Sequence, residues 1–298
     1  MRVFITGATG WIGSAIVREL VAGGHRVTGL VRSDHNSETL SALGATPVLG
    51  SLDDPDLLRR AADEADGVIH TAFGVDFSRF AEMGRQEQQV IEAFGEVYAG
   101  SDRPVVATSG FFVLPPGQTF TEAVFPAPVD PRLPRAPEQA VALITERGVR
   151  ATVVRLPRSV HGRGERHGFV PMLAKVARDT GVSAFVGDGE NLWPSVHRLD
   201  AAHLFCLALQ NGAEGGPFHA VADEGVPYRL IAEAIGRQLG VPARSLSPDE
   251  ATAHFGLLAL FVGGNGPASS RRTRQRLGWE PLQADLISDI DHPDYFTS

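Results

Sequence analysis

The sequence predicts an α/β protein with a doubly wound parallel sheet and a smaller C-terminal domain. Short runs rich in Val and Ile alternate with stretches of helical periodicity through the first half of the chain. The first of these runs, residues 2–5, leads directly into a turn with three glycines. After residue 160 the alternation becomes less regular. Because the strand runs are continuously apolar, helices are expected on both faces of the sheet.

The predicted elements of the first half follow one another in strand–helix order. Strands are predicted at residues 2–5, 26–31, 45–50, 67–72, 104–109 and 150–156. Helices are predicted at residues 14–20, 55–64, 80–99 and 138–147. Six prolines lie between Phe111 and Pro137, where no periodicity is visible, so a long loop is expected after the fifth strand. Long loops at the carboxyl end of a strand commonly border active sites.

The second half of the chain contains fewer predicted elements. Helices are predicted at residues 169–180, 201–209, 228–239 and 271–277. We expect residues 1–160 to form the first domain, with residues 197–222 returning to it. The smaller domain would then consist of residues 161–196 and 223–298.

Composition and charge exclude several classes of protein. The 298 residues carry a net charge of −8 and no long basic run, which argues against a partner made of nucleic acid. Cys206 is the single cysteine, so no intramolecular disulfide is expected. The first strand begins almost at once and leaves no room for a signal peptide. These observations predict a cytoplasmic protein.

The most apolar stretch of the chain, residues 255–262, is too short to cross a bilayer. No association with a membrane is therefore expected. Two interpretations remain for this stretch. It is either a lid over a substrate pocket or a contact surface in a homodimer.

The turn after the first strand has the spacing of a phosphate-binding loop. Gly7 permits a tight turn, Gly10 lets a diphosphate approach the backbone, and Gly13 lets the following helix pack closely. The first amides of that helix would point at the anion, assisted by the helix dipole. The loop residues expected to contact a dinucleotide are Gly7, Thr9, Gly10, Trp11, Ile12 and Gly13. The alternative is a glycine-rich turn that binds no nucleotide.

Several motifs, in order along the chain, resemble those of the extended short-chain dehydrogenases/reductases, the superfamily of nucleotide-sugar epimerases and dihydroflavonol reductases. They lie at residues 6–13, 68–72, 108–109, 154–162, 193–200 and 277–281. The resemblance covers nearly the whole chain. It implies a Rossmann fold for the first domain and a substrate-binding role for the smaller one.

The resemblance fails at the catalytic pair. Members of this family normally carry Tyr-x-x-x-Lys, in which the tyrosine exchanges a proton and the lysine lowers its pKa. The tyrosines of this chain are Tyr98, Tyr228 and Tyr295, and none has a lysine four residues later; Lys175 is the only lysine. The usual acid–base pair is therefore absent.

Two alignments locate the positions of the missing pair. If Glu138 is the glutamate that commonly follows it, the tyrosine and lysine positions fall on Asp130 and Pro134. Counting from Glu122 instead places them near residues 133 and 137. Neither alignment restores a phenol or an ammonium group.

The residue after the second strand predicts which dinucleotide is bound. Arg32 stands where an acidic residue would select NAD(H), and its guanidinium suits a 2′-phosphate. The sequence thus favours NADP(H) over NAD(H), the alternative being that Arg32 is a solvated surface residue. The resemblance implies further cofactor contacts from the ends of later strands, at Leu52, Thr71, Ala72, Thr108, Pro157 and Ser159.

Few candidates remain for proton transfer. Ser109 is expected to hydrogen-bond a substrate beside the nicotinamide, or else to cap a strand. His161 and His197 have the side chain that titrates near neutral pH, although such residues are commonly structural. Asp130 is a candidate through the alignment alone. Phe111, Phe112 and Trp193 are expected to line a substrate pocket or to pack in a core.

Metal and hydrolase sites are not indicated. No His, Cys or acidic residues have the spacing of metal ligands, and no Gly-x-Ser-x-Gly motif is present. The sequence therefore predicts an NADP(H)-dependent oxidoreductase that transfers hydride to a small carbonyl, imine or activated alkene. A non-catalytic NADP(H)-binding sensor or scaffold is the second hypothesis. An isomerase of the nucleotide-sugar epimerase/dehydratase type is the third.

Overall fold

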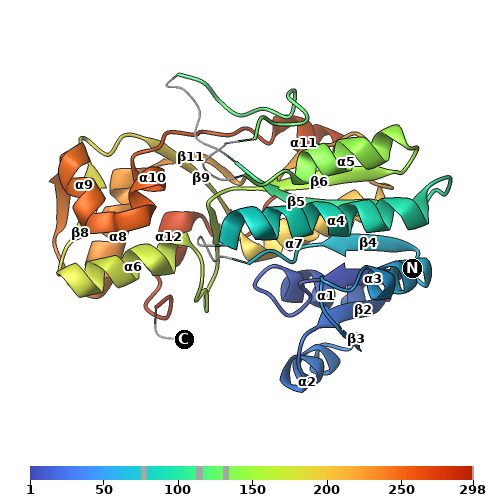
Figure 1. Cartoon of the computed structure of the whole chain (residues 1–298). Coiled ribbons are helices and arrows are strands. Elements are labelled where there is room, and N and C mark those ends of the chain that lie inside the picture. The colour runs from blue at the N-terminus through green and yellow to red at the C-terminus, as the bar shows by residue number, and fades with distance from the viewer. Residues whose placement is uncertain (75–78, 112–116, 130–133, 297–298) are drawn as a thin grey trace.

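A computed structural model describes residues 1–74, 79–111, 117–129 and 134–296. Its larger part is a seven-stranded sheet in the order β10-β6-β5-β4-β1-β2-β3 (Figure 1). Its strands are β1 (Arg2–Thr6), β2 (Arg26–Val31), β3 (Thr46–Leu49), β4 (Gly67–His70), β5 (Val105–Gly110), β6 (Ala151–Leu156) and β10 (Phe218–His219). All neighbouring strands pair in parallel. The predicted doubly wound α/β class is confirmed.

Helices cover both faces of this sheet because its central strands are apolar on both sides. Val3 and Ile5 of β1 belong to one buried cluster and Phe4 to another. The flanking helices are α1 (Gly13–Ala22), α2 (Asp34–Ala42), α3 (Pro55–Asp63), α4 (Phe80–Tyr98), α5 (Pro137–Glu146) and α7 (Arg198–Gln210). Residues of α1 and α7 fill the first cluster, and residues of α3, α4 and α5 fill the second.

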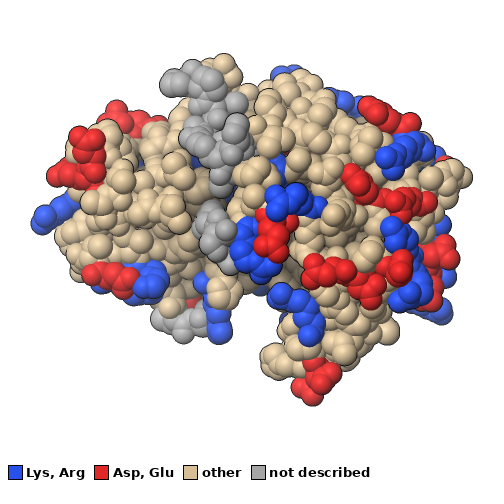
Figure 2. Space-filling model, in the orientation of Figure 1, with Lys and Arg blue, Asp and Glu red and all other residues tan. Residues whose placement is uncertain are grey.

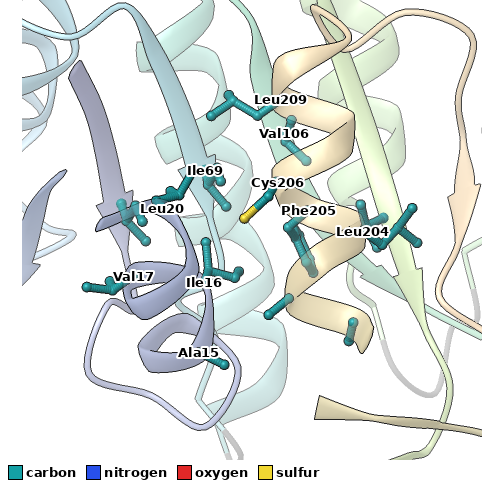
Figure 3. Packing of buried hydrophobic residues seen from close by; sticks show 14 of the residues in the cluster. Ala15, Ile16, Val17, Leu20, Ile69, Val106, Leu204, Phe205, Cys206 and Leu209 are labelled. Atoms are coloured by element: carbon teal, nitrogen blue, oxygen red, sulfur yellow. The ribbon is translucent and has the colours of Figure 1, made fainter. Parts of the chain in front are cut away.

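Helices α1 and α7 are distant in sequence and pack side by side on one face of the sheet. Figure 3 shows Ile16 and Leu20 of α1 near Phe205 and Cys206 of α7. Ile69 of β4 and Val106 of β5 lie beside them. Residues 197–222 thereby contribute both α7 and β10 to the large sheet and its cover.

The remaining elements form a second group around smaller sheets. One sheet has the order β11-β9-β7 and the other pairs β12 with β8. These strands are β7 (Ser159–His161), β8 (Ser183–Val186), β9 (Leu192–His197), β11 (Asp223–Pro227) and β12 (Ala243–Leu246). The helices are α6 (Phe169–Thr180), α8 (Tyr228–Leu239), α9 (Pro248–Phe255), the 3-10 turn η2 (Gly256–Leu258), α10 (Ala259–Val262) and α12 (Leu286–Ile290). Helix α11 (Arg271–Leu277) packs instead against the large sheet beside β10. A separate buried cluster centred on Trp193 and Tyr228 holds most of this group together.

The sequence analysis missed two elements of the large sheet region, the two-residue strand β10 and helix α2. The nine residues of α2 bury only Leu40, so no apolar stripe marks the helix in the sequence. Its start is fixed by Ser33, whose side chain accepts a hydrogen bond from the Asn36 amide. The predicted strand at residues 67–72 is shorter than expected. It ends at His70, whose pairing with Thr6 is the last of the β1–β4 ladder, and the hydroxyl of Thr71 donates to the carbonyl of Thr6.

The apolar stretch at residues 255–262 is only partly buried. Leu258 and Val262 pack in the cluster around Trp193, whereas Leu257 is 66% and Leu260 is 48% exposed. None of the helices in the described part of the chain combines the length and apolar character needed to cross a membrane. Figure 2 shows acidic and basic side chains interspersed on the face that it draws.

Candidate functional site

The loop between β1 and α1 requires glycine at two positions. Gly7 has a φ of +75°, and a Cβ on it would lie 2.8 Å from the Ala72 nitrogen and from two atoms of Thr71. A Cβ on Gly13 would lie 2.0 Å from the carbonyl oxygen of Gly7. Side chains are thus excluded from a turn that packs directly against the end of β4.

The same loop leaves backbone donors available at the start of α1. The amide of Gly10 donates to Gly7 and that of Ser14 donates to Gly10. Among the described residues, the amides of Trp11, Ile12 and Gly13 donate to no other backbone oxygen. The helix has no side-chain cap at Ile12 and no acidic residue in its first turn. An uncapped helix start with free amides fits the diphosphate of a dinucleotide.

Trp11 connects this loop to the second group of elements. Its indole Nε1 donates to the carbonyl of Val160 in β7 at 2.7 Å. The guanidinium of Arg198, at the start of α7, lies 4.1 Å from the centre of the Trp11 ring. Trp11 therefore fixes the loop against β7 and α7, and its side chain contacts other parts of the protein.

The adenosine side of the site lies at the ends of β2 and β3. Arg32 directly follows β2 and is exposed, and Ser33 after it caps α2. No carboxylate stands at the end of β2; Asp34 is already the first residue of the helix. Leu52 lies after β3 and lines a groove between α3 and α4.

Two of the residues expected at the cofactor also form hydrogen bonds to neighbouring strands. The hydroxyl of Thr71 donates to the Thr6 carbonyl at 2.9 Å. The hydroxyl of Thr108 donates to the His70 carbonyl at 2.9 Å. These bonds hold the carboxyl ends of β1, β4 and β5 together, so that the edge where a nucleotide would lie is rigid.

Ser109 belongs to a buried polar network centred on Glu138. The Ser109 hydroxyl donates to Glu138 Oε1 at 2.8 Å, and both residues are 2% exposed. Arg155 donates to both oxygens of the same carboxylate at 2.8 Å. The amide of Ala127 also donates to it, at 2.7 Å. The hydroxyl proton of Ser109 thus points to Glu138, and its catalytic role stays a prediction.

Arg155 extends this network to His219. Its Nη1 donates to His219 Nε2 at 3.0 Å, and His219 Nδ1 donates to the Ser269 carbonyl at 2.7 Å. Burial, with the charge of Arg155, lowers the pKa of His219 to about 3. His219 is therefore neutral, and the only counter-charge of Arg155 in this network is Glu138.

A second, partly buried ion pair lies at the ends of β4 and β5. Arg135 donates to both oxygens of Glu87, at 2.8 and 2.5 Å, and its Nη2 also donates to the Thr108 carbonyl at 3.0 Å. Its guanidinium carbon lies 4.0 Å from the centre of the Phe73 ring. Burial raises the pKa of Glu87, and Arg135 opposes that shift.

The two candidate histidines lie together, away from Ser109. Their rings are 5.5 Å apart, and His161 Nδ1 is 2.8 Å from Asp289 Oδ2. His197 Nδ1 accepts the Leu199 amide and so caps α7. Burial, followed by the charge of His161, lowers the pKa of His197. No hydrogen bond joins either histidine to Ser109 in the described ranges, and their catalytic roles stay predictions.

Beside this pair, Glu165 is buried against the C-terminal segment. The Tyr295 hydroxyl donates to Glu165 Oε2 at 2.6 Å. Burial, together with the charge of Asp289, raises the pKa of Glu165 from 4.5 to about 8, against the effect of the Tyr295 hydrogen bond. Glu165 is therefore mostly protonated at neutral pH in the folded protein.

We expect Glu165 to make the protein less stable as the pH rises. The folded state holds this proton up to about pH 8 and the unfolded state only to about pH 4.5, so stabilisation falls between these values. The Glu165→Gln variant should keep the Tyr295 hydrogen bond and reduce the decline by about 3 kcal/mol or less. Urea unfolding at pH 5 to 9 measures this difference. The exposed Glu280→Gln control should keep the wild-type slope; an unchanged slope in Glu165→Gln would contradict the expectation.

The remaining predicted residues lie in different parts of the structure. Pro157 and Ser159 are buried after β6, and the Ser159 hydroxyl has no partner among the described residues. Phe111 packs edge-on against His219, with ring centres 4.7 Å apart. Trp193 is 0% exposed and packs against Tyr228, inside the cluster of the second group. Asp130 and Phe112 lie outside the described residues.

The three tyrosines are buried and the lysine is exposed. Tyr98, Tyr228 and Tyr295 are each at most 1% exposed. Lys175 lies on α6, with its side chain 73% exposed and paired to Asp179. Over the described ranges, no group of three or more His, Cys, Asp or Glu side chains is arranged to hold a metal.

Comparison with known proteins agrees with this geometry. A family model described as NAD(P)H-binding matches residues 7–185. The chain belongs to this family. An uncharacterized protein of Schizosaccharomyces pombe is 48% identical over 99% of this chain and 100% of its own length. An uncharacterized protein of Saccharomyces cerevisiae is 43% identical over 97% and 98%.

More distant relatives of this NAD(P)H-binding protein have names. The sterol-4-alpha-carboxylate 3-dehydrogenase of Dictyostelium discoideum is 26% identical over 82% of this chain and 78% of its own length. The UDP-glucose 4-epimerase of Thermus thermophilus, solved as a complex with NAD, has a TM-score of 0.73 and 21% identity over 98% and 97% of the two chains. The resemblance to the extended short-chain dehydrogenases/reductases is thereby confirmed at the level of fold and family.

The sequence analysis missed the ion pairs at the carboxyl ends of β4, β5 and β6. Glu138 served only to align the missing pair, and Glu87, Arg135 and Arg155 were not singled out. A signal was present for Arg135, since it directly follows the aligned lysine position at Pro134. Its partner Glu87 lies 48 residues away, and only the folded sheet brings the two together.

Proposed function

We propose that this protein is an NADP(H)-dependent oxidoreductase that reduces a small carbonyl, imine or activated alkene. The observation that supports it most is the uncapped start of α1, where free amides and the glycine turn form a seat for a diphosphate. Bound NADPH would supply a hydride from C4 of its nicotinamide. The relative named as a dehydrogenase supports an oxidoreductase rather than a hydrolase.

Selection of the phosphorylated cofactor rests on Arg32. An exposed guanidinium after β2, without a carboxylate at that strand end, can pair with a 2′-phosphate. Ser33 beside it exposes a further hydrogen-bonding hydroxyl at the start of α2. We infer a preference for NADPH over NADH.

The Arg32→Gln variant should bind NADPH about 10- to 100-fold more weakly, because one charge-assisted contact is lost. Its affinity for NADH should stay close to that of the wild type. Calorimetric titration with each cofactor measures both values. Arg244→Gln, which removes an exposed arginine from β12, is the control and should bind NADPH normally. Equal NADPH affinity in Arg32→Gln and wild type would overturn the preference.

The absence of a tyrosine–lysine pair restricts the substrates that the site can reduce. A ketone needs a proton on oxygen as hydride arrives, and no phenol or ammonium is available near Ser109. An iminium carbon or an activated alkene depends less on such a donor. NADPH oxidation against panels of ketones, imines and enones tests the proposal, with imines or enones expected to react faster. No turnover with any panel would count against an oxidoreductase.

The absence of the tyrosine–lysine pair also favours a second function. The Ser109 proton is directed to Glu138 and all three tyrosines are buried, so the site suits binding better than proton transfer. The protein would then be a sensor or scaffold that binds NADP(H) without reacting. Tight NADPH binding without oxidation by any panel would support this alternative. An epimerase is disfavoured, since that chemistry relies on the tyrosine; bound NAD retained through purification would revive it.

A further inference from the structure

The order of strands determines which half of a dinucleotide lies at which strand end. The loop after β1 suits the diphosphate and Arg32 after β2 suits the adenosine. On the other side of β1 the sheet continues through β4 to β5. The nicotinamide half would therefore extend over the carboxyl ends of β4 and β5.

Arg135 is held at this place from three directions. Glu87 of α4 accepts two hydrogen bonds from it, the Thr108 carbonyl of β5 accepts a third, and the Phe73 ring after β4 lies under its guanidinium. Helix α4 also fixes its backbone, because a Cβ on Gly84 would lie 2.5 Å from the Pro134 oxygen. The guanidinium is thus fixed in position before any ligand arrives.

One nitrogen of this guanidinium, Nη1, is available to a ligand. Nε and Nη2 make all three hydrogen bonds, so Nη1 keeps both of its N–H groups without a partner among the described residues. The side chain is 16% exposed, and Nη1 is not among its fully enclosed atoms. His70, whose Nε2 lies 4.0 Å from Glu87 Oε1, is neutral, since burial and Arg135 lower its pKa to about 3.

We propose that Arg135 binds the nicotinamide half of the cofactor, with Nη1 donating hydrogen bonds to the hydroxyl oxygens of its ribose. This inference rests on the proposed function, because it requires a bound NADP(H). Arg135 then provides a fixed positive charge on the nicotinamide side of the site, where no lysine lies. Glu87 is a positioning residue that acts through Arg135.

Two probes separate the halves of the cofactor. NADPH contains both, whereas adenosine 2′,5′-bisphosphate contains only the adenosine side. The Arg135→Met variant should bind NADPH on the order of 10- to 100-fold more weakly and adenosine 2′,5′-bisphosphate as well as wild type does. Arg32→Gln should weaken both probes. Calorimetric titration measures each affinity.

Further variants separate a direct contact from damage to the fold. Arg135→Met leaves Glu87 buried without its cation, so Glu87→Gln/Arg135→Met removes both charges and should recover thermal stability but not NADPH affinity. Arg103→Met is the matched control. Arg103 lies 4.2 Å from the centre of the Tyr98 ring and donates to the backbone carbonyls of Asp63, Ala65 and Val97, far in the fold from the strand ends that form the site. It should bind both probes normally.

The outcomes are distinguishable. Wild-type protein that binds neither NADPH nor adenosine 2′,5′-bisphosphate would refute the proposed function itself. Normal NADPH affinity in Arg135→Met, or an equal loss for both probes, would overturn the role of Arg135 alone. Recovery of NADPH affinity in the double variant would show that Arg135 acts only by neutralising Glu87.

Discussion

The Gly13→Ala variant is expected to lose NADPH binding by more than about 100-fold. The added Cβ would lie 2.0 Å from the Gly7 carbonyl oxygen, so the loop or the start of α1 must move. Alanine normally stabilises a helix relative to glycine by about 1 kcal/mol. Here we expect the opposite sign, with the free energy of unfolding lowered by about 1–3 kcal/mol as in other overpacked sites.

Titration calorimetry and urea unfolding measure the two effects of Gly13→Ala. The control is Gly263→Ala, because a Cβ on Gly263 meets no atom within 4 Å. That variant should bind NADPH with wild-type affinity and unfold at nearly the wild-type urea concentration. If Gly13→Ala bound NADPH normally, the loop could not be the seat of the diphosphate.

The Glu138→Ala variant is expected to lose about 3–5 kcal/mol of folding free energy. The side chains of Glu138 and Arg155 are each 3% exposed, and removing one charge leaves the other buried without a counter-charge. The variant also leaves the Ser109 hydroxyl and the Ala127 amide without their acceptor. Chemical unfolding at neutral pH measures the loss.

An exposed ion pair supplies the control for Glu138→Ala. Lys175 and Asp179 are 73% and 60% exposed, so Lys175→Met should change the unfolding free energy by less than about 0.5 kcal/mol. A loss in Glu138→Ala as small as that of Lys175→Met would mean that the Glu138–Arg155 pair contributes little to stability. The comparison therefore separates a buried network from a surface contact.

The elements that could be predicted from sequence are those whose signal is local. The glycine turn follows from the spacing of Gly7, Gly10 and Gly13 beside an apolar strand, and the structure explains Gly7 and Gly13 by a close backbone approach. Six strands of the large sheet follow from continuous apolar runs, whereas β10 has only two residues and no such run. Helix α2 escaped because a helix that buries only Leu40 has no apolar stripe to detect.

The polar contacts of the site could not be predicted, because they join distant parts of the chain. Ser109 meets Glu138 across 29 residues, and His161 meets Asp289 across 128. A sequence gives the residue types but not which hydroxyl already has an acceptor. The same limit explains why Arg135 was overlooked, although it stands next to an aligned motif position.

Trp279 has a consequence for the order in which the molecule is built. It is fully buried in the cluster that joins α1 to α7, and its indole donates to the Asp200 carbonyl at 3.0 Å. The amides of Leu282 and Gln283 donate to the Asp200 carboxylate. The layer of α1 and α7 can therefore close only after residues 279–283 have left the ribosome, so this side of the large sheet cannot complete its packing from the first 210 residues alone.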